Sequence, residues 1–237
     1  MDTRRSGNDV PAAALGNAAA DYRWLLDRGY PDQPAIKLVG DRYRLSRVER
    51  GMLYRGVFSD QASRRRSARL RPAEDLGGRK VTVDGYNVLF TIWNYLAGRP
   101  VVEATDRFVR DIGGTQSRLP RDERFLGLAR VFCETLCSLR ASMITVLLDE
   151  PLPWSRDQAS VLQDEWSRGR CGGFEVLLET GVDGRLARTD NGWIATSDTG
   201  IIDRCDCPVV DLGGYILRRR YRTEPIRLIA DPEDRPE

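Results

Sequence analysis

Three short apolar stretches in the second half of the chain end in aspartate. TVD ends at Asp84, LLD at Asp149 and ATSD at Asp198. If these stretches are strands of an open parallel sheet, their carboxyl ends lie at one edge, where such sheets bind ligands. Carboxylates gathered there repel one another unless a cation lies between them, and oxygen ligands suit Mg²⁺ or Mn²⁺. The sequence therefore predicts a metal site formed by the three aspartates.

Other polar residues lie close to these strand ends. Asn87, three residues after Asp84, is expected either to orient water or metal or to cap the following helix. A helix starting after Asp198 would return Asp203 to the site as a further metal ligand. Each strand-end aspartate also has an ordinary alternative as a helix N-cap or turn residue. For Asp211, which follows the last expected strand, the cap is the favoured interpretation.

The chain contains no histidine, and its five cysteines include no C-x-x-C pair. The first fact excludes serine–histidine triads, imidazole general bases and histidine zinc sites. Water activated by a carboxylate-bound metal needs no imidazole, so this chemistry remains open. An odd number of cysteines without regular spacing favours small buried thiols over a disulfide framework, with a zinc site as the alternative.

Helical patterns dominate the N-terminal part of the chain. Residues 18–28 predict an amphipathic helix, and the S-x-x-E sequence that begins at Ser46 is typical of a capping box. Residues 35–45 predict a short extended stretch, and residues 71–79, with one proline and paired glycines, predict a linker. We expect a disordered tail over residues 1–13, followed by a basic, mostly helical region over residues 14–75.

Beyond the linker, strand and helix patterns alternate. A long helix is predicted over 120–141. Strands are predicted at 80–85, 143–150, 174–179, 191–198 and 207–213. Short buried strands separated by helices imply an α/β domain of three layers with a mainly parallel sheet, similar to a Rossmann fold. This domain is expected to span 79–222, with a C-terminal tail over 223–237.

Positive charge is concentrated in the N-terminal region. The net charge of the chain is +2, but ten arginines and only two acidic residues lie within 42–71. Such a patch could attract a phosphate backbone. The predicted contacts to RNA are Arg64, Arg65, Arg66 and Arg69. The alternative is a solvated helix face. Nearly all basic residues of the whole chain are arginine, so the presence of arginine at these positions is weak evidence for RNA binding.

Two segments resemble members of the PIN-like nuclease superfamily. KVTVDGYNVLFTI resembles the first strand and turn of NYN-type members, and WIATSDTGIID resembles a later PIN strand that carries a T-x-D segment. The resemblance implies that Asp84, Asp149, Asp198 and Asp203 bind Mg²⁺ or Mn²⁺ with support from Asn87.

A longer N-terminal phrase, LLDRGYPDQPAIKLVGDRYRLSRVERGMLYRGV, resembles an uncharacterised prokaryotic family. That family is domain of unknown function 434, with a PIN-like C-terminal half, and the similarity covers most of the chain. PIN domains usually carry another acid on a helix after the first strand. Asp106 and Asp111 are the options for this position.

These observations predict a metal-dependent ribonuclease that acts on single-stranded RNA. The alternative is a catalytically inactive PIN-like module that binds nucleic acid or protein. A phosphatase is disfavoured because the chain has neither a D-x-D-x-[TV] motif nor a P-loop. Without an apolar run of about 18 residues or a convincing signal peptide, we expect a cytoplasmic protein without membrane contact. The sequence leaves open whether it forms homo-oligomers.

Overall fold

The computed structural model describes residues 12–113, 118–169 and 171–229, and within them the chain forms two compact units. The first unit comprises the described parts of 1–67, 100–112 and 225–237, and the second comprises those of 68–99 and 113–224. Most of the tail expected at 1–13 lies outside the described residues. No helix among the described residues is both long and apolar enough to cross a bilayer.

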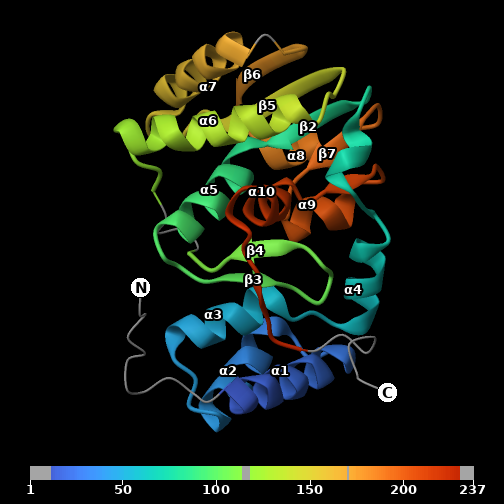
Figure 1. The fold of residues 1–237 in the computed structure, drawn as a ribbon. Coiled ribbons are helices and arrows are strands. Elements are labelled where there is room, and N and C mark those ends of the chain that lie inside the picture. Colours follow the sequence, from blue (N-terminus) through green and yellow to red (C-terminus); the bar gives the residue numbers. More distant parts are fainter. Residues whose placement is uncertain (1–11, 114–117, 170, 230–237) are drawn as a thin grey trace. The chain divides into compact units, whose positions relative to one another are not determined.

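The first unit combines four helices with a small sheet (Figure 1). The helices are α1 (Ala12–Asp27), α2 (Asp32–Arg42), α3 (Arg47–Gly56) and α4 (Asp60–Ser67). The strands are β3 (Val101–Glu103), β4 (Val109–Asp111) and β9 (Ile226–Arg227). β3 pairs with β4 in antiparallel and with β9 in parallel orientation. Strand β9 thus lies inside the stretch that was expected to be a tail.

An apolar core of its own holds the first unit together. Tyr22, Leu53 and Val102 are almost fully buried in it, and Leu228 reaches it from the end of the chain. The capping box predicted at Ser46 is confirmed, since this residue exchanges hydrogen bonds with Glu49 at the start of α3.

The extended stretch predicted for 35–45 is wrong, because most of it belongs to α2. Ala35, Ile36, Val39 and Gly40 are buried at positions that share one face of a helix. Gly40 also lies so close to Arg50 of α3 that a Cβ atom would overlap the guanidinium. Packing between two helices therefore decides the conformation of this segment.

The second unit is built on a six-stranded parallel sheet in the order β1-β8-β7-β2-β5-β6. The strands are β1 (Leu70–Arg71), β2 (Lys80–Asp84), β5 (Met143–Asp149), β6 (Gly173–Glu179), β7 (Trp193–Ala195) and β8 (Val209–Val210). All five predicted strands are confirmed, whereas β1 was not expected. A short 3-10 helix, η1 (Ala73–Leu76), buries Leu76 completely, so the linker expected over 71–79 is part of the folded unit.

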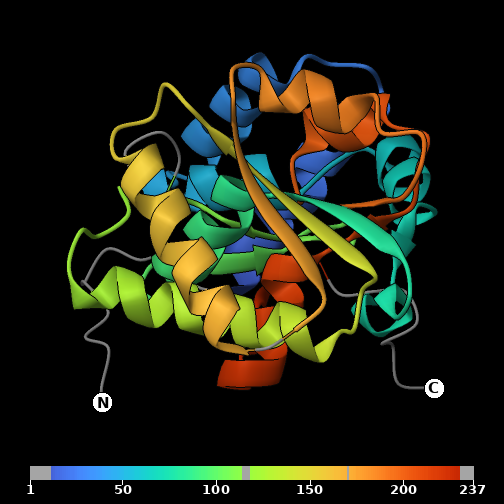
Figure 2. The ribbon, with the colours of Figure 1, turned by 90° about the horizontal axis from the view of Figure 1, so that it is seen from above.

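Helices cover both faces of this sheet, as Figure 2 shows. One group packs together and comprises α5 (Gly85–Leu96), α6 (Glu123–Ser138), α7 (Ser155–Gly169) and α10 (Leu212–Tyr221). A second pair comprises α8 (Val182–Ala187) and α9 (Thr199–Arg204). The chain runs from β2 outward through β5 to β6, and then returns to the other side of β2 to form β7 and β8. This doubly wound order is consistent with a Rossmann-like fold of three layers.

One disulfide joins Cys137, at the end of α6, to Cys171, just before β6. The expectation of buried thiols is wrong for this pair. It is confirmed for Cys133, Cys205 and Cys207, which are buried free cysteines.

Candidate functional site

The strand order reverses between β2 and β7, and this reversal places the predicted acidic residues. In sheets of this type, the crevice at the carboxyl ends of the strands beside the reversal is where ligands bind. Asp84 is the last residue of β2, and in register Val83 lies beside Ala195 of β7. Asp84 also pairs with Leu147 of β5. Asp149 therefore extends two residues further along the sheet edge, or roughly 7 Å at about 3.3 Å per residue.

Asp84 is anchored through both carboxylate oxygens. As N-cap of α5, it accepts a hydrogen bond at Oδ1 from the backbone N–H of Asn87, at 3.3 Å. Its Oδ2 accepts a hydrogen bond from the hydroxyl of Thr196, at 2.8 Å. The same Thr196 Oγ1 accepts one from the backbone N–H of Asp198, at 3.1 Å. A single hydroxyl thus connects the first and third predicted acids.

Asp198 is the N-cap of α9, and its Oδ1 accepts a hydrogen bond from the N–H of Ile201 at 3.0 Å. The side chain is exposed, in contrast to Asp84, which is 7% exposed. The capping role considered as the ordinary alternative is therefore present at both residues. In Asp84, capping uses only Oδ1, whereas Oδ2 accepts the hydrogen bond from Thr196.

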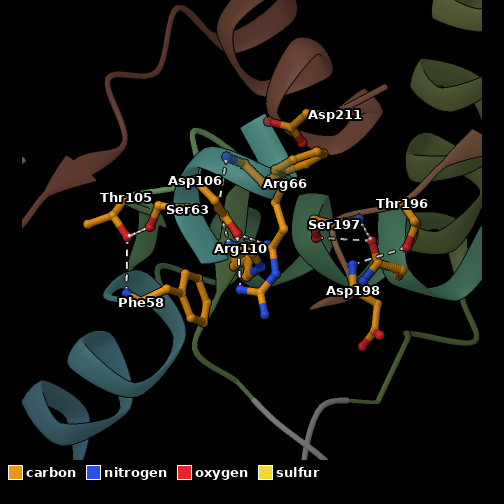
Figure 3. A network of polar contacts seen from close by, with 12 residues as sticks. Phe58, Ser63, Arg66, Thr105, Asp106, Arg110, Thr196, Ser197, Asp198 and Asp211 are labelled. Carbon is orange, nitrogen blue, oxygen red and sulfur yellow. Dashed lines mark hydrogen bonds and ion pairs between the residues drawn. The ribbon is translucent and has the colours of Figure 1, made fainter. Parts of the chain in front are cut away.

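Asn87 joins the turn after β2 to the turn after β7. Its side-chain oxygen accepts hydrogen bonds from the N–H of Ser197 at 2.9 Å and from the Ser197 hydroxyl at 3.1 Å. Figure 3 shows Thr196, Ser197 and Asp198 together in this turn. The structure therefore gives Asn87 a positioning role, in which its carbonyl oxygen is engaged with protein.

Close approach of the chain to the neighbouring strand explains the glycine after Asp84. A Cβ atom on Gly85 would lie 2.5 Å from a methyl carbon of Leu148 and 2.9 Å from the backbone oxygen of Leu147. Only glycine fits there without displacing β5. The D-G pair of the DGYN segment is therefore a packing requirement of the turn that carries Asp84.

The carboxylates act on one another electrostatically. The pKa of Asp84 is raised to about 7, and burial is the main cause. The charges of Asp198 and Asp149 also raise this pKa, whereas the hydrogen bonds from Thr196 and Asn87 lower it. Burial also raises the pKa of Asp149, with a contribution from the charge of Asp183. The repulsion expected of acids at one sheet edge is therefore present.

Asp183 was not predicted from the sequence. It lies exposed in the first turn of α8, four residues after the end of β6. An acid close to the end of a fourth strand is the sequence signal that could have indicated Asp183. The acid that ends this strand is instead Glu179, and its carboxylate pairs with Arg185.

Metal-binding geometry is incomplete around these acids. Within the described ranges, no group of three or more cysteine, aspartate or glutamate side chains is arranged to hold a metal ion. Asp203, the further ligand expected after Asp198, lies half-buried in α9. Asp211 is the N-cap of α10, as favoured from the sequence, and accepts a hydrogen bond from the N–H of Gly214.

Comparison with known proteins places this architecture in a family. The profile described as Domain of unknown function (DUF5616) matches residues 73–215. The chain belongs to the DUF5616 family. A second profile, Protein of unknown function (DUF434), matches residues 14–69, in agreement with the resemblance of the N-terminal phrase. An uncharacterized protein of Methanocaldococcus jannaschii is 29% identical over 189 residues, which cover 80% of this chain and 89% of the relative. No solved structure matches the chain.

The DUF5616 match spans most of the second unit and also residues 100–112, which belong to the first unit and contain Asp106 and Asp111. Asp106 is fully buried and pairs with Arg110 at 2.7 Å and with Arg66 at 3.5 Å (Figure 3). Both oxygens of its carboxylate thus accept hydrogen bonds from guanidinium groups. Asp111 lies in β4.

Arg66 differs from the expectation of an exposed RNA contact. Its side chain is 9% exposed, pairs with Asp106, and stacks over the ring of Phe58 at 4.5 Å. Arg64 and Arg65 are exposed on α4. In the second unit of this DUF5616 protein, Arg69 donates a hydrogen bond to the backbone oxygen of Ile202 at 3.1 Å.

Proposed function

We propose that this protein is a metal-dependent ribonuclease of the PIN-like, NYN-type superfamily, acting in the cytoplasm on single-stranded RNA. Asp84, Asp149 and Asp198 would bind Mg²⁺ or Mn²⁺. The observation that carries the proposal is the position of these acids after β2, β5 and β7, around the reversal of the strand order. Burial and the charges of Asp149 and Asp198 raise the pKa of Asp84 and so oppose its ionisation.

The donor chemistry fits a hard cation. Carboxylate oxygens are the ligands that Mg²⁺ and Mn²⁺ prefer, and a cation would offset the burial and repulsion that oppose ionisation of Asp84. A bound ion would supply an activated water and stabilise charge on a phosphodiester. Thr196 would hold the Oδ2 oxygen of Asp84 in place, and Asn87 would hold the turn that bears Asp198.

Further residues complete the proposal around this centre. Asp203, in α9, would be an additional ligand. Arg64, Arg65 and Arg69 would bind the RNA backbone through phosphate contacts, which contribute affinity without base selectivity.

A second candidate is a PIN-like module that binds nucleic acid without cleaving it. Two observations favour it: no ready-made group of three ligands is present in the described part of the chain, and the side-chain oxygen of Asn87 is occupied by Ser197.

The decisive experiment incubates the purified full chain with labelled single-stranded RNA and Mn²⁺ or Mg²⁺. We expect cleavage by the wild type and a loss of at least about 10- to 100-fold in the Asp84→Asn and Asp198→Asn variants, since even outer-shell partners of metal sites cost this much. Asp75→Asn is the matched control, because Asp75 is an exposed carboxylate in η1, which precedes the amino end of β2, whereas Asp84 ends that strand.

Each outcome separates the candidates. Cleavage retained in both variants would refute the acidic centre. Tight RNA binding without cleavage in either metal would replace the ribonuclease by the binding module. Equal loss in the Asp75→Asn control would show that removal of any carboxylate of the second unit, not of the site, explains the effect.

A further inference from the structure

A pocket of about 340 Å³ opens in the second unit, and the mechanism proposed above does not use it. Its wall is formed by the start of α5, the loop after β5 and the segment that precedes α6. The residues that matter to the argument are Tyr86, Phe90, Arg118, Arg121 and Trp154. This volume is at the low end of small-ligand sites, which hold about 300–1,000 Å³, and suits a single nucleotide unit.

The pocket adjoins the acidic residues through the chain itself. Tyr86 follows Asp84 by two residues, and Trp154 follows Asp149 by five. The backbone oxygen of Asp149 accepts a hydrogen bond at 3.1 Å from the N–H of Leu152, which lines the pocket. A ligand in this pocket would therefore lie next to the carboxylates at the sheet edge.

Aromatic rings form one side of the pocket and are held in place. The hydroxyl of Tyr86 donates a 2.7 Å hydrogen bond to the side-chain oxygen of Gln158, which is 7% exposed. The rings of Tyr86 and Phe90 stack with centroids 5.7 Å apart. These contacts fix a flat apolar surface before any ligand arrives, which reduces the entropy lost on binding.

Trp154 is the exposed element of this surface. It is 48% exposed, although burial of an indole is strongly favourable. Its backbone φ is 71°, a left-handed conformation that is uncommon for residues other than glycine. Strained residues of this kind cluster at ligand-binding positions, where the surrounding structure holds them. Here the backbone oxygen of Trp154 accepts a hydrogen bond from the N–H of Gln158 at 2.9 Å.

Two guanidinium groups give the pocket positive charge beside the acidic edge. Arg121 lies over the ring of Trp154 at 3.9 Å, and Arg118 lines the same pocket. Within the ranges that the structure describes, neither arginine forms an ion pair with a carboxylate of the chain. Aromatic faces next to unpaired arginines are what single-stranded nucleic acids require, because bases stack and phosphates bind cations.

We infer that this pocket binds one nucleobase of single-stranded RNA, stacked on Trp154, with Arg118 and Arg121 directed to the adjoining phosphate. The inference rests on the proposed function, because it concerns a nucleotide next to the one at the acidic centre. It assigns the pocket to the base and the sheet edge to the scissile phosphate.

The test measures binding of a short labelled single-stranded RNA to the full chain in chelator, by fluorescence anisotropy. Trp154→Ala should weaken binding roughly 5- to 150-fold, the range that base–aromatic stacking supplies. Trp154→Phe should retain most of the affinity. The matched control is Trp24→Ala: Trp24 is 52% exposed and has Arg28 over its ring at 3.5 Å, but it lies in the first unit.

An abasic nucleotide series identifies the group that is bound. When the base that enters the pocket is removed, wild type and Trp154→Ala should bind equally. An effect of Trp154→Ala that persists on a fully abasic strand would overturn the stacking inference. Wild-type affinity for a nucleoside monophosphate equal to that for RNA would overturn the assignment to RNA.

The pocket and the ribonuclease can fail separately. Unchanged RNA binding in Trp154→Ala, together with metal-dependent cleavage by the wild type, would refute the pocket and leave the nuclease intact. Binding that depends on Trp154 in a protein that cleaves no RNA would refute the nuclease and leave the pocket. Circular dichroism of each variant confirms that its fold is retained.

Discussion

Replacing Asp84 by asparagine is expected to stabilise the protein at pH 8 far more than at pH 5 when divalent cations are chelated. The carboxyl group is buried and its pKa is raised to about 7, so the fold favours its neutral form. A raised pKa in the native state contributes stability that is present below about pH 4 and is lost as the pH rises through about 7. Asparagine keeps the shape of the neutral acid and has no charge to lose.

The size of the effect follows from the pKa. The difference between 3.8 and about 7 corresponds to roughly 4 kcal/mol at 1.36 kcal/mol per pKa unit. Between pH 5 and pH 8, roughly 2 to 3 kcal/mol of this should appear as an increasing advantage of the variant. Loss of the acceptor for the Thr196 hydroxyl should cost about 1 kcal/mol at every pH, and this cost leaves the slope unchanged.

Urea denaturation at several pH values measures the free energy of unfolding directly. Tryptophan fluorescence follows mainly the second unit, because every tryptophan except Trp24 lies there. The matched control is Asp211→Asn, since Asp211 is also a buried N-cap but pairs with Arg218. Its replacement should destabilise without a gain toward high pH.

Two results would refute this reasoning. A difference between wild type and Asp84→Asn that stays constant from pH 5 to pH 8 would mean that Asp84 ionises without cost. A decrease of that difference with rising pH would mean that the charge is stabilised. Addition of Mn²⁺ at pH 8 should stabilise the wild type by about 2.7 kcal/mol at a hundred times the dissociation constant, with little effect on the variant.

Packing and covalent structure give further predictions. Gly85→Ala should lower the free energy of unfolding in urea titrations by about 1–3 kcal/mol, because its Cβ would overlap Leu148. Gly127→Ala in α6 is the control, since a Cβ there meets nothing within 4 Å, and it should be neutral or stabilise the protein by up to about 1 kcal/mol. Equal effects of the two changes would contradict the packing argument. Reduction of the Cys137–Cys171 disulfide, which spans 34 positions, should lower the free energy of unfolding by about 3–4 kcal/mol. Thermal melts with and without reductant, beside a double alanine variant, test this; a variant as stable as the oxidised protein would contradict it.

The sheet of the second unit was largely predictable because its strands are buried on both faces. Continuous apolar runs such as MITVLLD identify such strands without knowledge of their partners. Strand β1 has two residues, Leu70 and Arg71, and forms only by pairing with Val209 and Val210. No local pattern predicts a strand whose only support lies so far along the chain.

The candidate site was predictable in its main acids and not in its connections. Asp84 and Asp149 end their strands as expected, whereas Asp198 lies three residues beyond the end of β7, as the N-cap of α9. The hydroxyl of Thr196, which joins the first to the third, depends on side-chain geometry that spacing does not give. Asp183 was missed because it follows its strand by a turn of helix instead of ending it.

The basic region shows the opposite limit. A count of arginines in 42–71 predicts a charged surface but cannot say which side chains are exposed. Arg66 is buried because Asp106, forty positions later, folds back into the same unit together with Arg110. Charge density is a local property of the sequence, whereas burial of an ion pair depends on contacts between distant segments.

The composition of the first unit affects the order in which the chain can fold during synthesis. Its core takes Val102 from the middle of the chain and Leu228 from beyond the second unit. The ribosome therefore delivers every strand of the second unit before the first can close around its last core residue. We expect helices α1–α3 to stay loosely packed until Leu228 has been synthesised. In a chain ended at residue 224, these helices should therefore be sensitive to protease, while the parallel sheet is protected.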